Sequence, residues 1–300
     1  MHPALSVLLL TTLIGAGQGL FIALFVSELL AAGTLSPSFF VGGSALVVVF
    51  CILGLIASFF HLGHPERAWR AAAMWRSSWL SREVIALPAF MGVAALYGLA
   101  HWSGATYTLA LGVLGTLLSI VLFVCTAMIY AAVKVLKEWA HPLTVVNFTL
   151  LGCASGACLA TSYAVFAAPA LVVPLSQAAF SLIALSLVTR GAALLRNATL
   201  KPASTLQSAL GIRHPHIVQK SQGAMGGSFN TREFFHGKSP SFVRGVLTLL
   251  LFGGFVLPLI LVLTAPALAF VVHYGGLLAE RWYFFAEAQH PQNLYYQTVS

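Results

Sequence analysis

Long runs of apolar residues, separated by short polar segments, dominate the chain. The runs are continuous rather than alternating, and most reach the length of about 20 residues that an α-helix needs to cross a bilayer. This pattern differs from the short alternating strands of an outer-membrane barrel. Helices are expected at about 5–32, 39–61, 83–102, 107–132, 144–167, 171–195, 242–263 and 265–286. The chain is therefore predicted to be an all-α integral membrane protein, a bundle of eight transmembrane helices in which residues 1–300 form a single membrane domain.

The composition supports this fold class and excludes an ordinary soluble domain. Charged residues make up 7% of the chain, residues of the AVILMFWYC class make up 59%, and the mean hydropathy is +0.91. A typical globular protein has about 25% charged residues. The chain has too little polar surface to cover a water-exposed globule, so an enzyme that does all its chemistry in water is not expected.

The basic residues predict the orientation in the membrane. With eight crossings, all fifteen Lys and Arg residues fall on one side, and the connections on the other side carry none. By the positive-inside rule, both termini and the connection at about 196–241 should be cytoplasmic. We assign the net charge of +8 to this topology and to anionic membrane lipid, rather than to nucleic acid.

The connection at about 196–241 is the one sizeable segment predicted outside the membrane. It carries Arg232, Phe234, Phe235 and His236. Two interpretations remain open from the sequence. The segment is either a loop on the membrane surface or a docking surface for a soluble partner subunit, to which exposed aromatic and basic side chains are suited.

Two ionisable residues at the predicted cytoplasmic boundary are candidates for chemistry. His61 ends the predicted helix 39–61, and Glu83 begins the neighbouring antiparallel helix 83–102. A histidine can hydrogen-bond a quinone oxygen, and a carboxyl group near the aqueous side can exchange the protons that quinone reduction consumes. Spacing alone also permits a His–Glu or Arg–Glu pair that only fixes the helix ends.

No haem, iron–sulfur cluster or other metal site is expected in this chain. The four cysteines all lie in apolar runs without a C-x-x-C pair, and they are Cys51, Cys125, Cys153 and Cys158. Only His273 lies well inside a predicted helix, so a haem with two histidine ligands has no obvious pair. We expect His273 to be a hydrogen-bonded helix contact, with a proton-path role left open, and Glu28 either to reach water or to pair internally.

Two G-x-x-x-G spacings predict close helix packing. Gly15 and Gly19 lie in the first predicted helix, and Gly152 and Gly156 lie in the fifth. Glycines at this spacing allow two helix backbones to approach each other without intervening side chains.

The most specific sequence signal lies in residues 58–69, SFFHLGHPERAW, and 78–83, SWLSRE. Their HLG…P-x-R-A and W-L-S-R-E elements resemble the membrane anchor subunits of the dimethyl sulfoxide reductase type. The strongest motifs cover about 58–83, while helix number and length are similar over most of the chain. The resemblance implies a haem-free, eight-helix subunit that exchanges electrons between membrane quinone, either ubiquinone or menaquinone, and an iron–sulfur subunit bound to a molybdenum catalytic subunit. It assigns the quinone site to His61 and Glu83, with Arg67, Ser81 and Arg82 as secondary candidates.

Within this family, residues 2–7, 15–20 and 229–237 are most similar to anchors of cytoplasmic membrane-bound sulfite dehydrogenases. That resemblance implies delivery of electrons from sulfite oxidation into quinone, with the partner subunits on the cytoplasmic face of a bacterial inner membrane. A sulfoxide-type reductase anchor that oxidises quinol is the alternative, because the partner's substrate sets the direction. A secondary transporter is the alternative from another class, although no symmetric pair of broken helices is evident.

Overall fold

The computed structural model describes residues 1–31, 33–60, 62–201, 204–218 and 235–294, and in this part of the chain every regular element is a helix. The long helices are α1 (Leu5–Leu30), α2 (Pro37–Phe59), α3 (Trp79–Ser103), α4 (Thr108–Ala131), α5 (Pro142–Ala167), α6 (Val172–Ala198) and α11 (Pro266–Ala286). One further helix is built from α9 (Pro240–Leu251), the π-helical turn η4 (Phe252–Val256) and α10 (Leu257–Leu261). The short elements are η1 (Pro65–Met74), η2 (Pro169–Leu171), α7 (Leu206–Leu210) and η5 (Pro291–Leu294).

Within the described residues, seven helices are long and apolar enough to cross a membrane. They are α1 to α6 and the helix over Pro240–Leu261. Helix α11 is 21 residues long but is not among these seven, and it contains His273, Glu280 and Arg281. The predicted all-helical fold is therefore confirmed, whereas length and composition leave the eighth crossing undecided.

Serine side chains cap three of the helices at their N-termini. Ser36 accepts a hydrogen bond from the backbone N–H of Ser38 at the start of α2, and Ser239 accepts one from Phe242 at the start of α9. Ser78 likewise accepts from the Ser81 N–H, so α3 begins at Trp79, four residues before the predicted start at 83. As a result, Glu83 lies one turn inside α3 rather than at its first residue.

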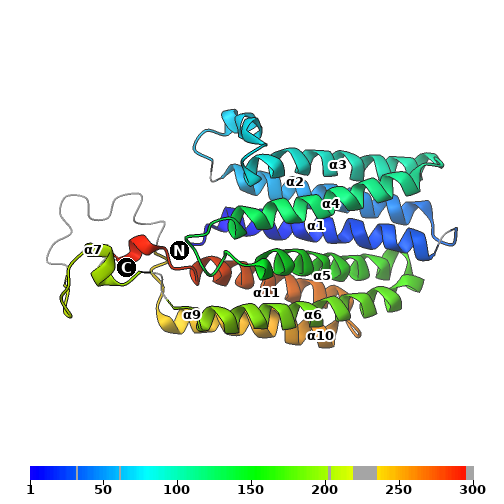
Figure 1. The fold of residues 1–300 in the computed structure, drawn as a ribbon. Helices are drawn as coiled ribbons and strands as arrows, with labels where there is room; N and C mark the ends of the chain where they lie inside the picture. Colours follow the sequence, from blue (N-terminus) through cyan, green and yellow to red (C-terminus); the bar gives the residue numbers. More distant parts are fainter. Residues whose placement is uncertain (32, 61, 202–203, 219–234, 295–300) are drawn as a thin grey trace.

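The long helices form two groups, with α1 to α4 in one and α5, α6, α9–α10 and α11 in the other (Figure 1). Helices α1 and α5 make the central contact between the groups, and their glycines face each other. A Cβ on Gly15 would lie 3.5 Å from the Cα of Gly152, and a Cβ on Gly156 would overlap the backbone of Gly19. The close packing predicted from the two G-x-x-x-G spacings is thus confirmed.

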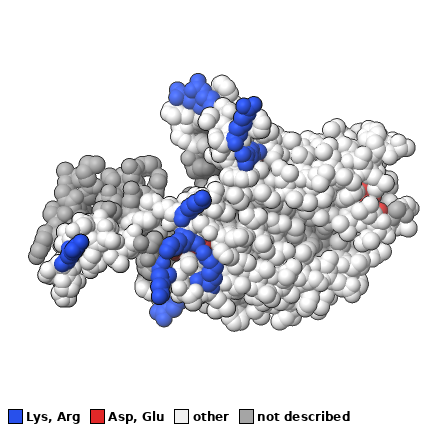
Figure 2. Space-filling model, viewed as in Figure 1, with Lys and Arg blue, Asp and Glu red and all other residues white. Residues whose placement is uncertain are grey.

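Lys and Arg side chains gather at the end of the bundle that carries η1, α7 and the N-terminus (Figure 2). Arginines lie over tryptophan rings just before and at the start of α3. Arg76 lies over Trp75 at 5.4 Å from the ring centroid, and Arg82 lies over Trp79 at 4.1 Å. Tryptophan and arginine together are typical of the interface between hydrocarbon and lipid headgroups. We call this end of the bundle the charged end.

Candidate functional site

Glu83 is buried near the charged end of the bundle, with 7% of its surface exposed. It lies four residues after Trp79, which is about 6 Å along α3 from its first residue. The Thr126 hydroxyl on α4 donates a hydrogen bond of 2.5 Å to Glu83 Oε1. No ion pair to Glu83 is formed within the described residues. A carboxyl group held by one neutral hydroxyl can accept a hydrogen bond from a ligand when ionised and donate one when protonated.

A small internal cavity lies beside the Glu83 carboxyl group, between α1, α3, α4, α5 and α11. Thr12, Gln18, Thr126 and Arg281 supply further polar side chains to its wall. Its volume is about 20 Å³, which is room for about one water molecule. We call it the inner cavity. A quinone ring is far larger, so binding a ring at Glu83 requires the surrounding side chains to move apart.

Arg281 brings a buried positive charge to the inner cavity. Its guanidinium lies 3.8 Å from the ring centroid of Phe148, and its Nε lies 2.5 Å from Glu280 Oε2. Among the described residues, neither terminal nitrogen of Arg281 has a hydrogen-bond partner, although the residue is only 3% exposed. Buried guanidinium N–H groups need acceptors, so these nitrogens favour a water molecule or another oxygen ligand in the cavity.

The buried charges continue from Arg281 toward the charged end. Arg190 on α6 lies between two carboxylates, with its Nε 2.8 Å from Glu280 Oε1 and its Nη1 3.1 Å from Glu287 Oε1. Glu287 directly follows α11, where burial raises the pKa of its carboxyl group and the nearby Arg190 opposes that rise. Arg281, Glu280, Arg190 and Glu287 thus form a continuous ion-pair network, which we call the α6–α11 network.

The other predicted quinone-site residues are not gathered around Glu83 in the same way. His61 lies outside the described residues. Ser81 is buried at the start of α3, and Arg82 donates hydrogen bonds from Nε to the Trp75 carbonyl and from Nη2 to the Arg76 carbonyl. Arg82 therefore holds the connection between α2 and α3. Arg67 is exposed in η1, and its Nε lies 3.5 Å from Glu66 Oε1.

The predicted docking segment is described only in part. Arg232 and Phe234 lie outside the described residues, whereas Phe235 and His236 are half-buried. The His236 ring lies 5.8 Å from the ring of Trp282 near the end of α11. Burial lowers the pKa of His236 below its usual range, and nearby positive charges lower it further. The described part of this segment therefore lies against α11 at the charged end.

His273 and Glu28 have internal partners in the described structure. His273 is fully buried, and its Nδ1 lies 2.7 Å from the Gly254 carbonyl oxygen in the π-helical turn, as expected of a hydrogen-bonded helix contact. Glu28 lies at the end of α1 opposite the charged end, where it accepts a 2.7 Å hydrogen bond from Tyr97 and lies 3.4 Å from His101 Nε2. Glu28 thus pairs internally. In the part of the chain described, no three His, Cys, Asp or Glu side chains are grouped to hold a metal.

Sequence reasoning missed the α6–α11 network, although a usable signal was present. Arg190 lies within the predicted helix 171–195, and Glu280 and Arg281 lie within 265–286. Charged residues inside spanning helices are costly and usually functional or paired. The positive-inside rule uses the basic residues only as indicators of topology, so it does not reveal their opposite-charge partners on another helix.

Comparisons with known proteins agree with the resemblance carried by residues 58–83. A family described as the DMSO reductase anchor subunit (DmsC) matches residues 1–212, which is more than half of the chain. The chain is also 52% identical to a sulfite dehydrogenase subunit from Allochromatium vinosum, over an alignment of 325 positions that covers the whole of both proteins. Given this match and its several long apolar helices, the chain is a multi-pass membrane protein that belongs to the family of DMSO reductase anchor subunits.

Proposed function

We propose that this chain is the quinone-binding anchor of a molybdenum and iron–sulfur oxidoreductase, and that it passes electrons from cytoplasmic sulfite oxidation to membrane quinone. The observation that carries the proposal is Glu83, a buried carboxyl group near the charged end whose described hydrogen-bond partner is a neutral hydroxyl. The whole-length similarity to a sulfite dehydrogenase subunit supports sulfite as the source of electrons. The molybdenum and iron–sulfur groups belong to the partner subunits, and this chain supplies the quinone site.

In this proposal His61 and Glu83 act on the oxygen atoms of the quinone ring. His61 hydrogen-bonds one ring oxygen, and the Glu83 carboxyl group exchanges protons with the ring as it is reduced. Thr126 keeps the carboxyl group oriented through its 2.5 Å hydrogen bond. The inner cavity holds about one water molecule, so a ring that reaches Glu83 displaces neighbouring side chains. In this proposal the ring approaches from the side of the α2–α3 connection, where His61 lies in the sequence.

We further propose that α11 is the eighth crossing and that both termini are cytoplasmic. Helix α11 runs beside α5 and α9 within the bundle (Figure 1). Its charged residues are buried and paired, Glu280 with Arg190 on α6 and Arg281 with Glu280. A crossing with internally paired charges is tolerated in a membrane. Eight crossings bring every described Lys and Arg toward the charged end, which the positive-inside rule assigns to the cytoplasm.

Cysteine labelling tests this orientation. His214 is exposed after α7 at the charged end, and Thr106 is exposed between α3 and α4 at the other end. With a membrane-impermeant maleimide, Thr106→Cys should be labelled in intact cells, whereas His214→Cys should be labelled only after permeabilisation. The parent chain controls for the native cysteines, of which three are buried and Cys153 is half-buried. The reverse pattern of labelling would refute the cytoplasmic orientation.

Purification in a mild detergent tests the function itself. The tagged chain should co-purify with a molybdenum subunit and an iron–sulfur subunit, and the complex should reduce decylubiquinone when sulfite is added. Recovery of these partners with quinol oxidation but no sulfite activity would support the sulfoxide-type alternative. A chain that purifies without partners and binds no quinone would refute the proposal and favour a transporter.

A further inference from the structure

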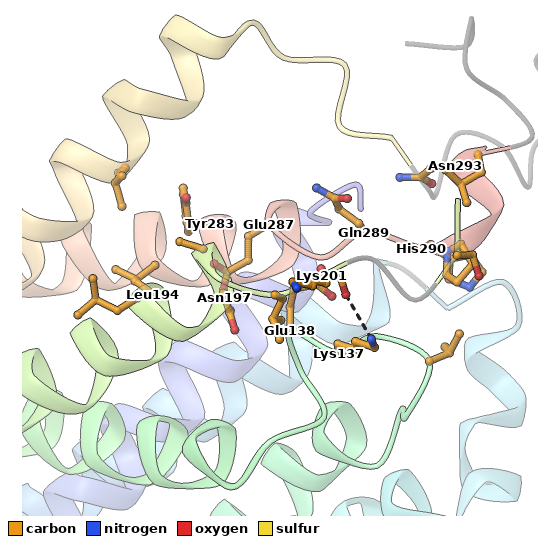
Figure 3. Close-up of a pocket in the computed structure, with 18 of the residues that line it drawn as sticks. Lys137, Glu138, Leu194, Asn197, Lys201, Tyr283, Glu287, Gln289, His290 and Asn293 are labelled. Atoms are coloured by element: carbon orange, nitrogen blue, oxygen red, sulfur yellow. Dashed lines mark hydrogen bonds between the residues drawn. The ribbon is translucent and has the colours of Figure 1, made fainter. Parts of the chain in front are cut away.

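Three cavities follow one another from the surface at the charged end to Glu83. The outer pocket, of about 620 Å³, is lined by Glu287, Tyr283, Asn197 and Glu138 among others (Figure 3). A middle cavity of about 10 Å³ shares Asn197 and Glu138 with the outer pocket. The middle cavity in turn shares Arg281 and Phe148 with the inner cavity beside Glu83. Each cavity thus shares lining residues with the next one, from the outer pocket to the inner cavity.

Each of the three cavities contains a carboxyl group, and the α6–α11 network joins two of them. Glu287 lines the outer pocket, Glu280 lines the middle cavity, and Glu83 lines the inner cavity. Arg190 bridges Glu287 and Glu280 through contacts of 3.1 and 2.8 Å. Arg281 contacts Glu280 and lines the inner cavity, and its two terminal nitrogens have no hydrogen-bond partner among the described residues, so oxygen ligands such as water are favoured there.

Buried apolar side chains lie in the opposite direction, between Glu83 and Glu28. On α3, the residues after Glu83 on the same face are Leu87, Phe90, Ala94 and Tyr97, all buried. On α1, fully buried Phe21 and Leu24 lie between Gln18 and Glu28, and the Phe21 ring packs edge-on against Phe90 at 5.5 Å and against Tyr97 at 5.2 Å. About 21 Å of α3, from Glu83 to Tyr97, separates the two polar regions. We call Phe21, Leu24, Leu87, Phe90 and Ala94 the apolar layer.

Charged and titratable groups surround Glu280 and continue to the outer pocket. Charged or titratable neighbours come from α6, from α11 and from the connection between α4 and α5. Those that line the middle cavity with Glu280 are Arg190, Arg196, Arg281, Glu138 and His141, and Glu287 and Tyr283 line the adjacent outer pocket. Arginine stays protonated, so the groups that can accept a proton include Glu138 and Glu287 at the outer pocket, and Glu138, His141 and Glu280 at the middle cavity. Of these, Glu280 contacts Arg281, which also lines the inner cavity.

We infer that Glu287 and Glu280, with water bound at Arg281, form a proton route from the charged end to Glu83, and that the apolar layer closes the route from the opposite face. This inference rests on the proposed role of Glu83 in quinone reduction. Reduction of one quinone to quinol takes two electrons and adds one proton to each ring oxygen. Oxidation of sulfite to sulfate, with one water molecule consumed, supplies two electrons and releases two protons. Release and uptake at the same face leave no proton transferred across the membrane.

The route is tested in the intact complex by replacing Glu280. Glu280→Gln should lower kcat for sulfite-dependent decylubiquinone reduction by about tenfold, while KM for the quinone changes by less than about twofold. The solvent isotope effect on kcat should increase, because proton delivery becomes limiting. Glu280→Asp should restore most of the rate. Electron transfer from sulfite to ferricyanide, which needs no protonated quinone, should be unchanged.

Glu28→Gln is the matched control, because Glu28 is also a buried carboxyl group but lies beyond the apolar layer. Its kcat and isotope effect should equal those of the parent complex. If Glu280→Gln is too unstable to assemble, Arg190→Gln combined with Glu280→Gln removes both charges of the pair, and Glu287→Gln tests the outer end. A parent-like isotope effect in these variants would overturn the route.

Two further outcomes separate this inference from the proposed function. If Glu83→Gln keeps full quinone turnover, the proposed quinone site is wrong. If Glu83→Gln is inactive but the Glu280 variants behave like the parent, the quinone site stands and the route is wrong. In sealed proteoliposomes, sulfite-dependent quinone reduction should generate no membrane potential, and a potential detected with an oxonol dye would overturn the closure by the apolar layer.

Discussion

Glu83→Gln is expected to reduce sulfite-dependent quinone turnover by about 100-fold or more, the usual contribution of a positioned proton-transferring side chain. Glutamine keeps the size of the side chain and can still accept the Thr126 hydrogen bond, but it cannot exchange a proton. Steady-state assay of the purified complex with decylubiquinone measures the loss. Sulfite-dependent ferricyanide reduction in the same preparation should stay at the parent level, because in the proposed complex those electrons leave through the soluble partner subunits.

Two variants control this prediction. Thr126→Val removes only the hydroxyl that orients Glu83, so a smaller loss of about tenfold is expected. Glu66→Gln changes an exposed carboxyl group in η1 of the same α2–α3 connection and should leave quinone turnover unchanged. Parent-like quinone turnover in Glu83→Gln, with the complex fully assembled, would show that the quinone is reduced elsewhere.

The helices could be predicted from sequence because a long apolar run by itself indicates a helix that can cross a membrane. The long runs gave the helical fold class directly, and Ser78 explains why α3 starts earlier than its apolar window suggests. Helix α11 differs because its charges are neutralised by ion pairs, Glu280 with Arg190 on α6 and Arg281 with Glu280, and such contacts cannot be read from hydropathy. The apolar run therefore predicts where this helix lies, but it does not show whether the charged residues in it allow the helix to cross the membrane.

Only those residues of the candidate site that lie in a short sequence motif could be predicted. The SRE element identified Glu83, because it lies in a run of residues specific enough to resemble a family. Thr126 and Arg281 come from α4 and α11, which are distant along the chain, and no local pattern links them to Glu83. Their contribution depends on which helices pack together. Both α4 and α11 contact α1 and α5, and residues of all four helices line the inner cavity. The close approach of α1 to α5 therefore helps to set where Thr126 and Arg281 lie.

Gly156→Ala is therefore expected to have a large effect on the stability of the bundle. An added Cβ at Gly156 would overlap the Gly19 backbone and the Leu20 nitrogen. Backbone atoms cannot swing aside as the end of a side chain can, so α1 and α5 must separate along the contact. We expect a loss of about 3 kcal/mol in the free energy of unfolding, the upper part of the usual range for overpacking. Denaturant titration of the purified chain in detergent measures it.

Gly191→Ala provides the matched control, since Gly191 is also in a long helix, α6, but a Cβ there meets no atom within 4 Å. Alanine favours a helix over glycine by about 1 kcal/mol, so this variant should be as stable as the parent or more stable. Equal stability of Gly156→Ala and the parent would mean that α1 and α5 are farther apart than described. Because Thr12 and Gln18 on α1 line the inner cavity, a separation of α1 from α5 should also lower quinone turnover in Gly156→Ala but not in Gly191→Ala.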